Sequence, residues 1–211
     1  MQKNILIHIG KCGGSTCREA ILNSEIIIDE VVHIHQPIID QYAKYFIIAR
    51  NPISKAVSAF NWRLNLVKSD AQQKERFAGE HDILLRYSNI NALAEALYFE
   101  DGTENIIAQG NFRSIHHLGE SISFYLNDIL KKISPDQIGG VLMQETLNED
   151  LLSVFGVSTF LQERRHSNKT PPERMYMSEN GIKNLRRFLK DDFTCLDILR
   201  SYGKINPKVI F

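Results

Sequence analysis

Short apolar runs alternate with segments of helical periodicity along the chain. Apolar runs bounded by glycine, proline or polar residues predict buried strands. The predicted strands cover residues 4–9, 31–37, 45–49 and 140–144. Predicted helices begin after the glycine-rich turn at 10–16 and at residue 52, and others cover 82–99, 121–133, 147–155 and 178–189. This alternation predicts an α/β fold with a central parallel sheet flanked by helices and ligands at the carboxyl ends of its strands.

The first predicted strand runs directly into a glycine-rich turn. The turn consists of Gly10, Lys11, Cys12, Gly13, Gly14, Ser15 and Thr16. Glycines let the backbone approach an anion closely, Ser15 and Thr16 are candidate caps of the next helix, and the N–H groups of a helix N-terminus favour negative charge. Because Lys11 adds a cation, the turn is a candidate cradle for a phosphate or sulfate group.

This turn differs from the Walker A motif of nucleotide triphosphatases. In that motif the lysine follows the second glycine, whereas Lys11 precedes the paired glycines. Magnesium-dependent phosphoryl transfer also needs a carboxylate at the end of a second strand. Here Arg50 follows the strand at 45–49. The pattern therefore predicts metal-free binding of a second anion.

The segment after Arg50 predicts a strand that turns directly into a helix. Asn51 is a suitable N-cap, and Pro52 suits the first helical turn. Ser58 lies on the side of the helix to which the cap projects, where its hydroxyl can bind an anion held by Arg50. An ordinary capped helix with a surface serine and arginine is the alternative. The apolar residues expected to pack on the sheet are Ile53, Val57, Phe60 and Leu64.

Residues 8–16 and 50–60 resemble the two signature segments of the sulfotransferases, most closely those of the carbohydrate branch. The family segments read His-Ile-Pro-Lys-Thr-Gly-Gly-Thr-Thr and Arg-Asp-Pro-x-x-Arg-x-x-Ser-x-Tyr. This chain keeps the lysine, the glycine pair, the arginine and the serine. It departs from the family at four positions, which are Gly10 for proline, Cys12 for threonine, Asn51 for aspartate and Lys55 for arginine.

The resemblance implies a P-loop-like three-layer fold and a defined donor site. The donor of the family is 3′-phosphoadenosine 5′-phosphosulfate (PAPS), and no metal is required. The implied donor-binding residues of the first turn are Lys11, Cys12, Gly13, Gly14, Ser15 and Thr16. Arg50 and Ser58 would hold the 3′-phosphate. Lys11 would also be catalytic, because its charge would neutralise the sulfuryl group and the leaving phosphate oxygen.

Two histidines in the run at 31–37 are candidates for acid–base chemistry. His33 and His35 have the spacing that places side chains on one side of a strand, and Pro37 ends the run. A neutral imidazole is a suitable base for a hydroxyl acceptor near pH 7. His-x-His also resembles the equivalent region of heparan-type sulfotransferases, which implies that His35 is the base and His33 positions the acceptor. A metal pair and two packed histidines are the alternatives.

The other histidines have less specific surroundings. His116 and His117 precede a helical pattern and are candidates for substrate contacts or for an alternative base. We expect His8 to be a hydrogen-bonded core residue, because it lies within a strand, and His81 to be a surface residue.

A polar, basic segment at 164–170 precedes two prolines and predicts a loop. In related sulfotransferases a late loop with an Asn-Lys-Ser/Thr-like core closes over the nucleotide. That likeness implies donor-binding roles for Asn168 and Lys169, and a solvated charge run is the alternative.

Composition bounds the class of protein. The chain has 211 residues, of which 43% are hydrophobic, and its 25 basic and 25 acidic residues give no net charge. We expect a single domain over 1–211, with 61–115 as the acceptor-recognition segment, and no nucleic-acid partner. Because no apolar run approaches the roughly 18 to 20 residues of a membrane span, we expect a cytoplasmic protein.

Three cysteines without paired spacing predict free thiols. Cys12 is either a loop-filling residue or, near Lys11 and a helix N-terminus, a reactive thiol.

These inferences converge on a PAPS-dependent sulfotransferase that transfers a sulfuryl group to a hydroxyl, most naturally on a saccharide. Two other classes remain open. A P-loop kinase-like phosphotransferase would use a similar turn but would need magnesium. A non-catalytic nucleotide-binding module would keep Lys11, Arg50 and Ser58 without a base.

Overall fold

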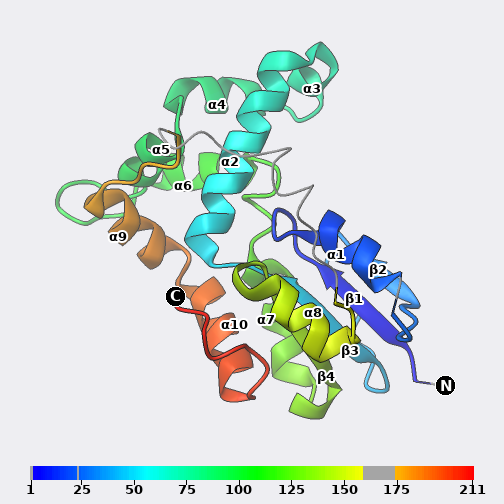
Figure 1. The fold of residues 1–211 in the computed structure, drawn as a ribbon. Helices are drawn as coiled ribbons and strands as arrows, with labels where there is room; N and C mark the ends of the chain where they lie inside the picture. The colour runs from blue at the N-terminus through cyan, green and yellow to red at the C-terminus, as the bar shows by residue number, and fades with distance from the viewer. Residues whose placement is uncertain (1, 23, 159–173) are drawn as a thin grey trace. The chain divides into compact units, whose positions relative to one another are not determined.

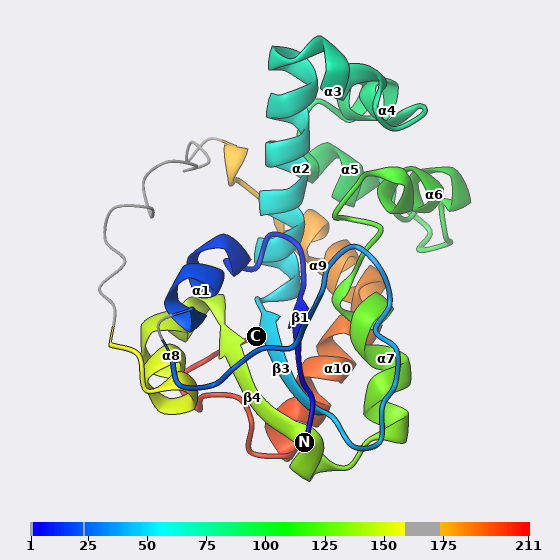
Figure 2. The same cartoon turned by 90° about the vertical axis from the view of Figure 1, so that its right-hand side faces the viewer.

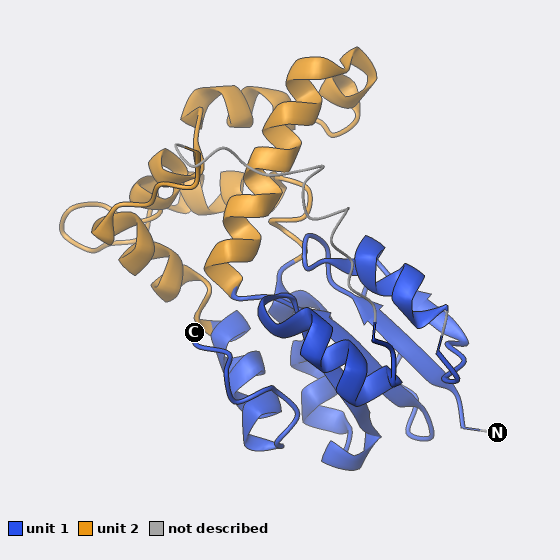
Figure 3. Ribbon diagram, viewed as in Figure 1, with its two compact units in different colours: residues 1–51, 121–168, 191–211 blue, residues 52–120, 169–190 orange. Residues whose placement is uncertain are grey.

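The computed structural model describes residues 2–22, 24–158 and 174–211. The chain divides into two compact units, coloured separately in Figure 3. Unit 1 comprises residues 1–51, 121–168 and 191–211, and unit 2 comprises residues 52–120 and 169–190. The segment at 61–115 thus lies within unit 2.

Unit 1 is built on a four-stranded parallel sheet (Figure 1). Its strands are β1 (Asn4–His8), β2 (Glu30–Val32), β3 (Lys44–Ala49) and β4 (Ile138–Met143), and their order across the sheet is β2-β1-β3-β4. Direct pairing of β1 with β3 brings the carboxyl ends of these strands together. The predicted α/β fold with a parallel sheet is confirmed.

Helices cover both faces of this sheet (Figure 2). α1 (Gly14–Ile21) and α8 (Leu147–Phe155) lie on one face, and α7 (Ile122–Lys132) and α10 (Lys190–Ser201) lie on the other. Short 3₁₀ helices, η1 (Pro135–Gln137) and η2 (Gln144–Thr146), flank β4. The predicted helices at 121–133 and 147–155 are confirmed, whereas α10 was not anticipated from the sequence.

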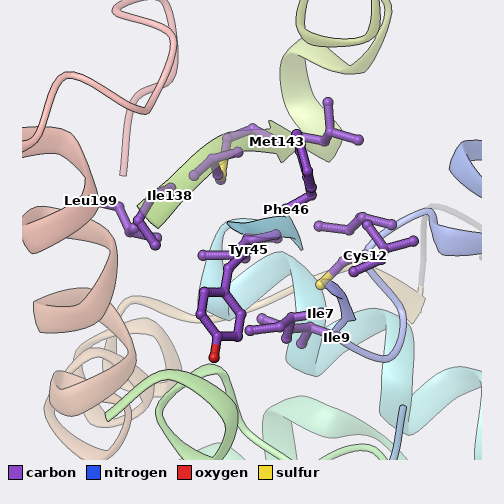
Figure 4. Packing of buried hydrophobic residues seen from close by; sticks show 14 of the residues in the cluster. Ile7, Ile9, Cys12, Tyr45, Phe46, Ile138, Met143 and Leu199 are labelled. Carbon is purple, nitrogen blue, oxygen red and sulfur yellow. The ribbon is translucent and has the colours of Figure 1, made fainter. Parts of the chain in front are cut away.

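The core of unit 1 lies between the sheet and these helices (Figure 4). Ile7, Ile47 and Ile48 are completely buried in the central strands. A parallel sheet covered on both faces buries every strand position, which explains why β1 and β3 are continuous apolar runs rather than alternating ones. Burial of each large apolar side chain contributes roughly 1.5 to 3 kcal/mol to folding.

The start of α7 is fixed by two different acceptors. Ser121 is its N-cap and accepts a hydrogen bond from Phe124 N at 3.0 Å. The buried Asp192 carboxylate, on α10, accepts from Ile122 N at 3.1 Å and Ser123 N at 2.8 Å. Because these N–H groups lack partners within the helix, a carboxylate from α10 couples the two helices on this face of the sheet.

Unit 2 is helical in its described part. Its helices are α2 (Pro52–Ser69), α3 (Ala71–Glu75), α4 (Glu80–Tyr87), α5 (Ile90–Ala96), α6 (Ile106–Ser114) and α9 (Glu179–Phe188). Pro52 is the first residue of α2, as the sequence predicts, and Ser178 caps α9, which lies within the helix predicted over 178–189. Within unit 2, α2 packs on α3, α4, α5 and α9. Val57, Phe60 and Leu64 are buried, as their spacing indicates, but Ile53 is half-buried.

The single helix predicted over 82–99 is wrong, because the structure has two helices there. Ser88 adopts a left-handed conformation with φ of 57° and ends α4. Asn89 then caps α5 by accepting a hydrogen bond from Ala92 N at 2.9 Å. Serine and asparagine bond readily to nearby backbone groups, so this pair ends one helix and begins the next within an otherwise continuous apolar pattern.

A buried ion pair joins α2 to α4. The Arg63 and Glu80 side chains are each only 1% exposed. The guanidinium of Arg63 binds both carboxylate oxygens of Glu80, with Nε at 3.0 Å from each, and Glu80 Oε1 also accepts from His116 N at 2.8 Å. One carboxylate therefore connects two helices and the turn that follows α6.

No helix among the described residues is long and apolar enough to cross a membrane.

Candidate functional site

The glycine-rich turn follows β1 and leads into α1 as predicted, but the start of the helix differs. Gly13, with φ of 91°, is the N-cap, and no side chain caps the helix. Ser15 and Thr16 lie inside α1, so the prediction that they cap it is wrong. Because glycine adopts the left-handed conformation without strain, the backbone turns at Gly13 and the helix begins earlier than a serine cap would allow.

Gly14 is required for a different reason from Gly13. A Cβ atom at Gly14 would lie 1.7 Å from Nε2 of His8 and would therefore clash with the imidazole ring. The absence of a side chain thus allows the first turn of α1 to pack directly on the end of β1. The glycine pair therefore combines one position that needs a positive φ with one that needs close packing.

Lys11 and Arg50 meet at the carboxyl ends of β1 and β3. Lys11 also has a left-handed backbone, with φ of 66°, and its carbonyl oxygen accepts a hydrogen bond from Arg50 Nη1 at 3.4 Å. Both side chains are half-buried. Burial and then the charge of Arg50 lower the pKa of Lys11 to about 8. Burial also lowers the pKa of Arg50.

One N–H donor of the Arg50 guanidinium has no hydrogen-bond acceptor among the described residues. Nε of Arg50 is buried, and it has no hydrogen-bond partner among residues 2–22, 24–158 and 174–211. A buried donor without a partner costs about 1 to 3 kcal/mol, and more for a charged group. An anion bound beside Arg50 would remove this cost.

A carboxylate that follows β4 reaches the same edge of the sheet. Glu145 Oε1 accepts a hydrogen bond from Asn51 N at 2.9 Å, and its charge acts on Arg50. In the sequence Glu145 already stands at the end of the strand predicted at 140–144. Its proximity to residue 51 was missed, because the two residues lie far apart along the chain.

Cys12 lies in the wall of the turn. Its side chain is completely buried, and Sγ contacts the Gly10 carbonyl oxygen at 3.6 Å. All three cysteines are buried thiols. Burial raises the pKa of Cys17 and of Cys195 to about 12. The complete burial of Cys12 favours the loop-filling interpretation.

His33 and His8 form a stacked pair at the end of β1. Their ring centroids are 4.3 Å apart with an interplanar angle of 14°, and His33 Nδ1 donates to the His8 carbonyl oxygen at 2.8 Å. Burial, followed by the charge of His33, lowers the pKa of His8 to about 4, so this imidazole is neutral at pH 7. His8 is half-buried rather than a core residue.

His35 lies in a loop and not on the predicted strand. β2 ends at Val32, and Ile34 has φ of 59°, so the alternation expected for His33 and His35 does not apply. The loop is held to α7, because Ile34 N donates to Tyr125 Oη at 3.0 Å. The His35 side chain is exposed, and its Nδ1 donates to the Gln36 carbonyl oxygen at 3.1 Å, which leaves Nε2 as the acceptor.

The remaining predicted residues belong to other parts of the chain. Ser58 is half-buried on α2 of unit 2, and His116 and His117 follow α6 in unit 2. Asn168 and Lys169 lie outside the described residues. His81 is half-buried and pairs with Asp82, at 3.0 Å between Nδ1 and Oδ1. The structure thus brings the Lys11 turn and Arg50 together within unit 1.

A second polar cluster lies in unit 2 at the turn after α6. The Glu120 carboxylate accepts from His117 N and contacts His116 Nδ1 at 3.3 Å. Burial favours the neutral acid, but the bonds to His116 and His117 outweigh it and lower the pKa of Glu120 to about 2. Glu120 was missed in the sequence, where its spacing of four residues from His116 was the available signal.

No family model, no curated protein and no solved structure matches this chain.

Proposed function

We propose that this chain is a P-loop-like sulfotransferase that transfers a sulfuryl group from PAPS to a hydroxyl, with a saccharide as the acceptor. The observation that carries the proposal is the pairing of Lys11 with Arg50 at the carboxyl ends of β1 and β3, beside the N-terminus of α1. Together with the signature-like spacing of these residues in the sequence, it favours an anionic donor at this edge of the sheet.

The electrostatics of this edge favour a ligand with two anionic groups. Burial lowers the pKa of Lys11 most, and repulsion by the charge of Arg50 lowers it further. An anion between them offsets both their repulsion and the cost of removing them from water. The two cations and the donors at the start of α1 match the 5′-phosphosulfate and the 3′-phosphate of PAPS.

The proposed reaction is a direct displacement at sulfur. The acceptor oxygen forms a bond to sulfur while the bond from sulfur to the 5′-phosphate oxygen breaks, and His35 takes the acceptor proton. Lys11 would stabilise the charge that develops on the leaving phosphate. Arg50 would hold the 3′-phosphate. Adenosine 3′,5′-bisphosphate would leave as the second product.

Transfer from labelled PAPS to a panel of saccharides tests the proposal. We expect label in at least one saccharide, released with a matching amount of adenosine 3′,5′-bisphosphate. Failure to bind the bisphosphate would contradict the donor assignment, while binding without transfer would support the nucleotide-binding module instead.

Arg50→Ala tests the 3′-phosphate contact. The wild type should bind adenosine 3′,5′-bisphosphate far better than AMP. The substitution should remove most of that preference, because a charge-assisted contact contributes roughly 1.5 to 3 kcal/mol, or about one to two decades of affinity. Calorimetry with both nucleotides measures this. Equal affinity of the wild type for the two nucleotides would exclude the role of Arg50.

Lys11→Ala tests the charge on the transferred group. Turnover should fall about 10²- to 10³-fold, as on removal of an oxyanion-stabilising donor, and bisphosphate affinity should fall less. Since the pKa of Lys11 is about 8, its ammonium is lost above that pH, so kcat/KM for the donor should decrease as pH rises through about 8. The variant should lack this basic limb. Equal losses in affinity and turnover would make Lys11 a binding residue only.

A kinase-like phosphotransferase is the second candidate, and Glu145 is the observation that favours it. A carboxylate beside Arg50 at the end of β4 could support a magnesium ion. Calorimetry with ATP, with and without magnesium, separates the candidates. A sulfotransferase should prefer the bisphosphate and be indifferent to magnesium, whereas a phosphotransferase should bind ATP more tightly with magnesium and lose this gain in Glu145→Gln.

A further inference from the structure

The turn that follows α6 gathers three potential metal ligands. Nitrogen atoms of His116 and His117 and a carboxylate oxygen of Glu120 all lie within 4.8 Å of one another. The cluster belongs to unit 2, whereas Lys11 and Arg50 belong to unit 1. The cluster shares no residue with the Lys11 turn or Arg50.

The backbone of this turn is tightly constrained. The N–H groups of Leu118 and Gly119 both donate to the Ile115 carbonyl oxygen at 2.9 Å. A Cβ atom on Gly119 would lie 2.2 Å from the Arg113 carbonyl oxygen, and His117 adopts φ of 66°. This compact path brings the side chains at 116, 117 and 120 together.

A buried lysine of α2 closes the turn from another side. Nζ of Lys55 donates to the carbonyl oxygens of His117 at 2.6 Å and Glu120 at 3.0 Å. The ammonium thus binds two backbone oxygens of the turn. Its charge opposes a cation nearby, so we expect moderate rather than very tight metal affinity.

Aromatic side chains surround the two imidazoles. His116 stacks on Phe77 with 4.5 Å between ring centroids, and it lies 4.0 Å from the ring of His117. Trp62 covers His117 at 5.1 Å. The His116 and Glu120 side chains remain 13% and 22% exposed. Aromatic rings therefore limit the access of water to the ligand atoms, and such a surrounding shell controls solvent access at a metal site.

We propose that His116, His117 and Glu120 form a zinc-binding site. Two imidazole nitrogens and one carboxylate oxygen are a ligand set that zinc accepts, with a water or a substrate atom as the fourth ligand. Tetrahedral bonds of about 2.0 to 2.2 Å place ligand atoms roughly 3.4 Å apart. Small side-chain rotations bring the three atoms to that separation.

Titration of the purified chain with zinc chloride, in competition with a chromophoric chelator, tests this site. One equivalent should bind. His116→Asn and Glu120→Gln should each weaken zinc affinity at least about 10- to 100-fold, since even the loss of an outer-shell partner has an effect of that size. Glu120→Gln can still accept the hydrogen bond from His117 N. Circular dichroism of each variant confirms folding.

Two matched controls locate the site. His81→Asn removes the other histidine–carboxylate pair of unit 2, and His33→Asn disrupts the stacked imidazole pair of unit 1; both should retain wild-type zinc affinity.

Cobalt in place of zinc should give visible d–d bands that disappear in Glu120→Gln. The proposal is overturned by unchanged zinc affinity in both cluster variants, by absence of stoichiometric binding, or by loss of binding in His33→Asn alone.

Discussion

His35→Ala should leave nucleotide binding almost unchanged and lower sulfuryl transfer about 10²- to 10⁴-fold, the usual contribution of a positioned general base. The His35 side chain is exposed, so its removal should leave the core intact. The loss of transfer can therefore be measured without an accompanying loss of folding or of nucleotide binding. Single-turnover transfer from labelled PAPS and calorimetry with adenosine 3′,5′-bisphosphate measure the two quantities separately.

The pH dependence of the same variant gives a second measurement. A base acts only when its imidazole is neutral, so transfer by the wild type should decline toward low pH. This acidic limb should disappear in His35→Ala, while the basic limb assigned to Lys11 should remain. The two limbs can therefore be assigned to different residues by comparing the variants.

Other histidines provide the controls for this prediction. His33→Ala should be milder if His33 only positions the acceptor; its ring stacks on that of His8. His81→Ala should have wild-type turnover. If His35→Ala keeps near-normal turnover while His116→Ala or His117→Ala loses it, the base lies in the turn after α6 and the assignment of His35 is wrong.

Glu80→Gln should destabilise the chain by about 3 to 5 kcal/mol, because it leaves the buried Arg63 guanidinium without its countercharge. The carboxylate also accepts from His116 N, so the effect should extend to the turn after α6. Urea denaturation followed by circular dichroism measures the free energy of unfolding. Replacing both partners, as Arg63→Met with Glu80→Leu, should cost far less, since no buried charge is then left alone.

An exposed ion pair of unit 1 offers the matched control. Lys208 contacts Glu149, and their side chains are 70% and 51% exposed. Glu149→Gln should scarcely change the unfolding midpoint, because surface pairs are screened by water. A similar loss in Glu80→Gln and Glu149→Gln would show that burial of the Arg63–Glu80 pair is not the source of its effect.

The order of apolar, polar, glycine and proline residues was enough to predict the conformation of those segments that depend only on their own residues. The apolar runs of β1, β3 and β4 predicted a parallel sheet, because only a strand buried on both faces remains apolar at consecutive positions. Pro52 marked a helix start through its restricted backbone. The glycine pair predicted a turn before α1, and the positive φ of Gly13 accounts for it.

Contacts between distant segments decided what the pattern alone left open. β2 ends at Val32, and the loop that follows is held to Tyr125 through Ile34 N. A Cβ atom on Gly14 would clash with the His8 ring, and no pattern in the sequence shows this contact. The proximity of Lys11 to Arg50 and of Glu145 to Asn51 follows from strand order.

The sequence by itself determined the central strands, the helices over 122–132 and 147–155, the glycine-rich turn and the identity of the cations near it, since these depend on neighbours along the chain. Only the tertiary structure decided that Gly13 caps α1, that Ser88 divides a helix, and that Glu120 joins His116 and His117. Such features depend on which backbone groups and side chains meet after folding, and residue spacing does not specify these encounters.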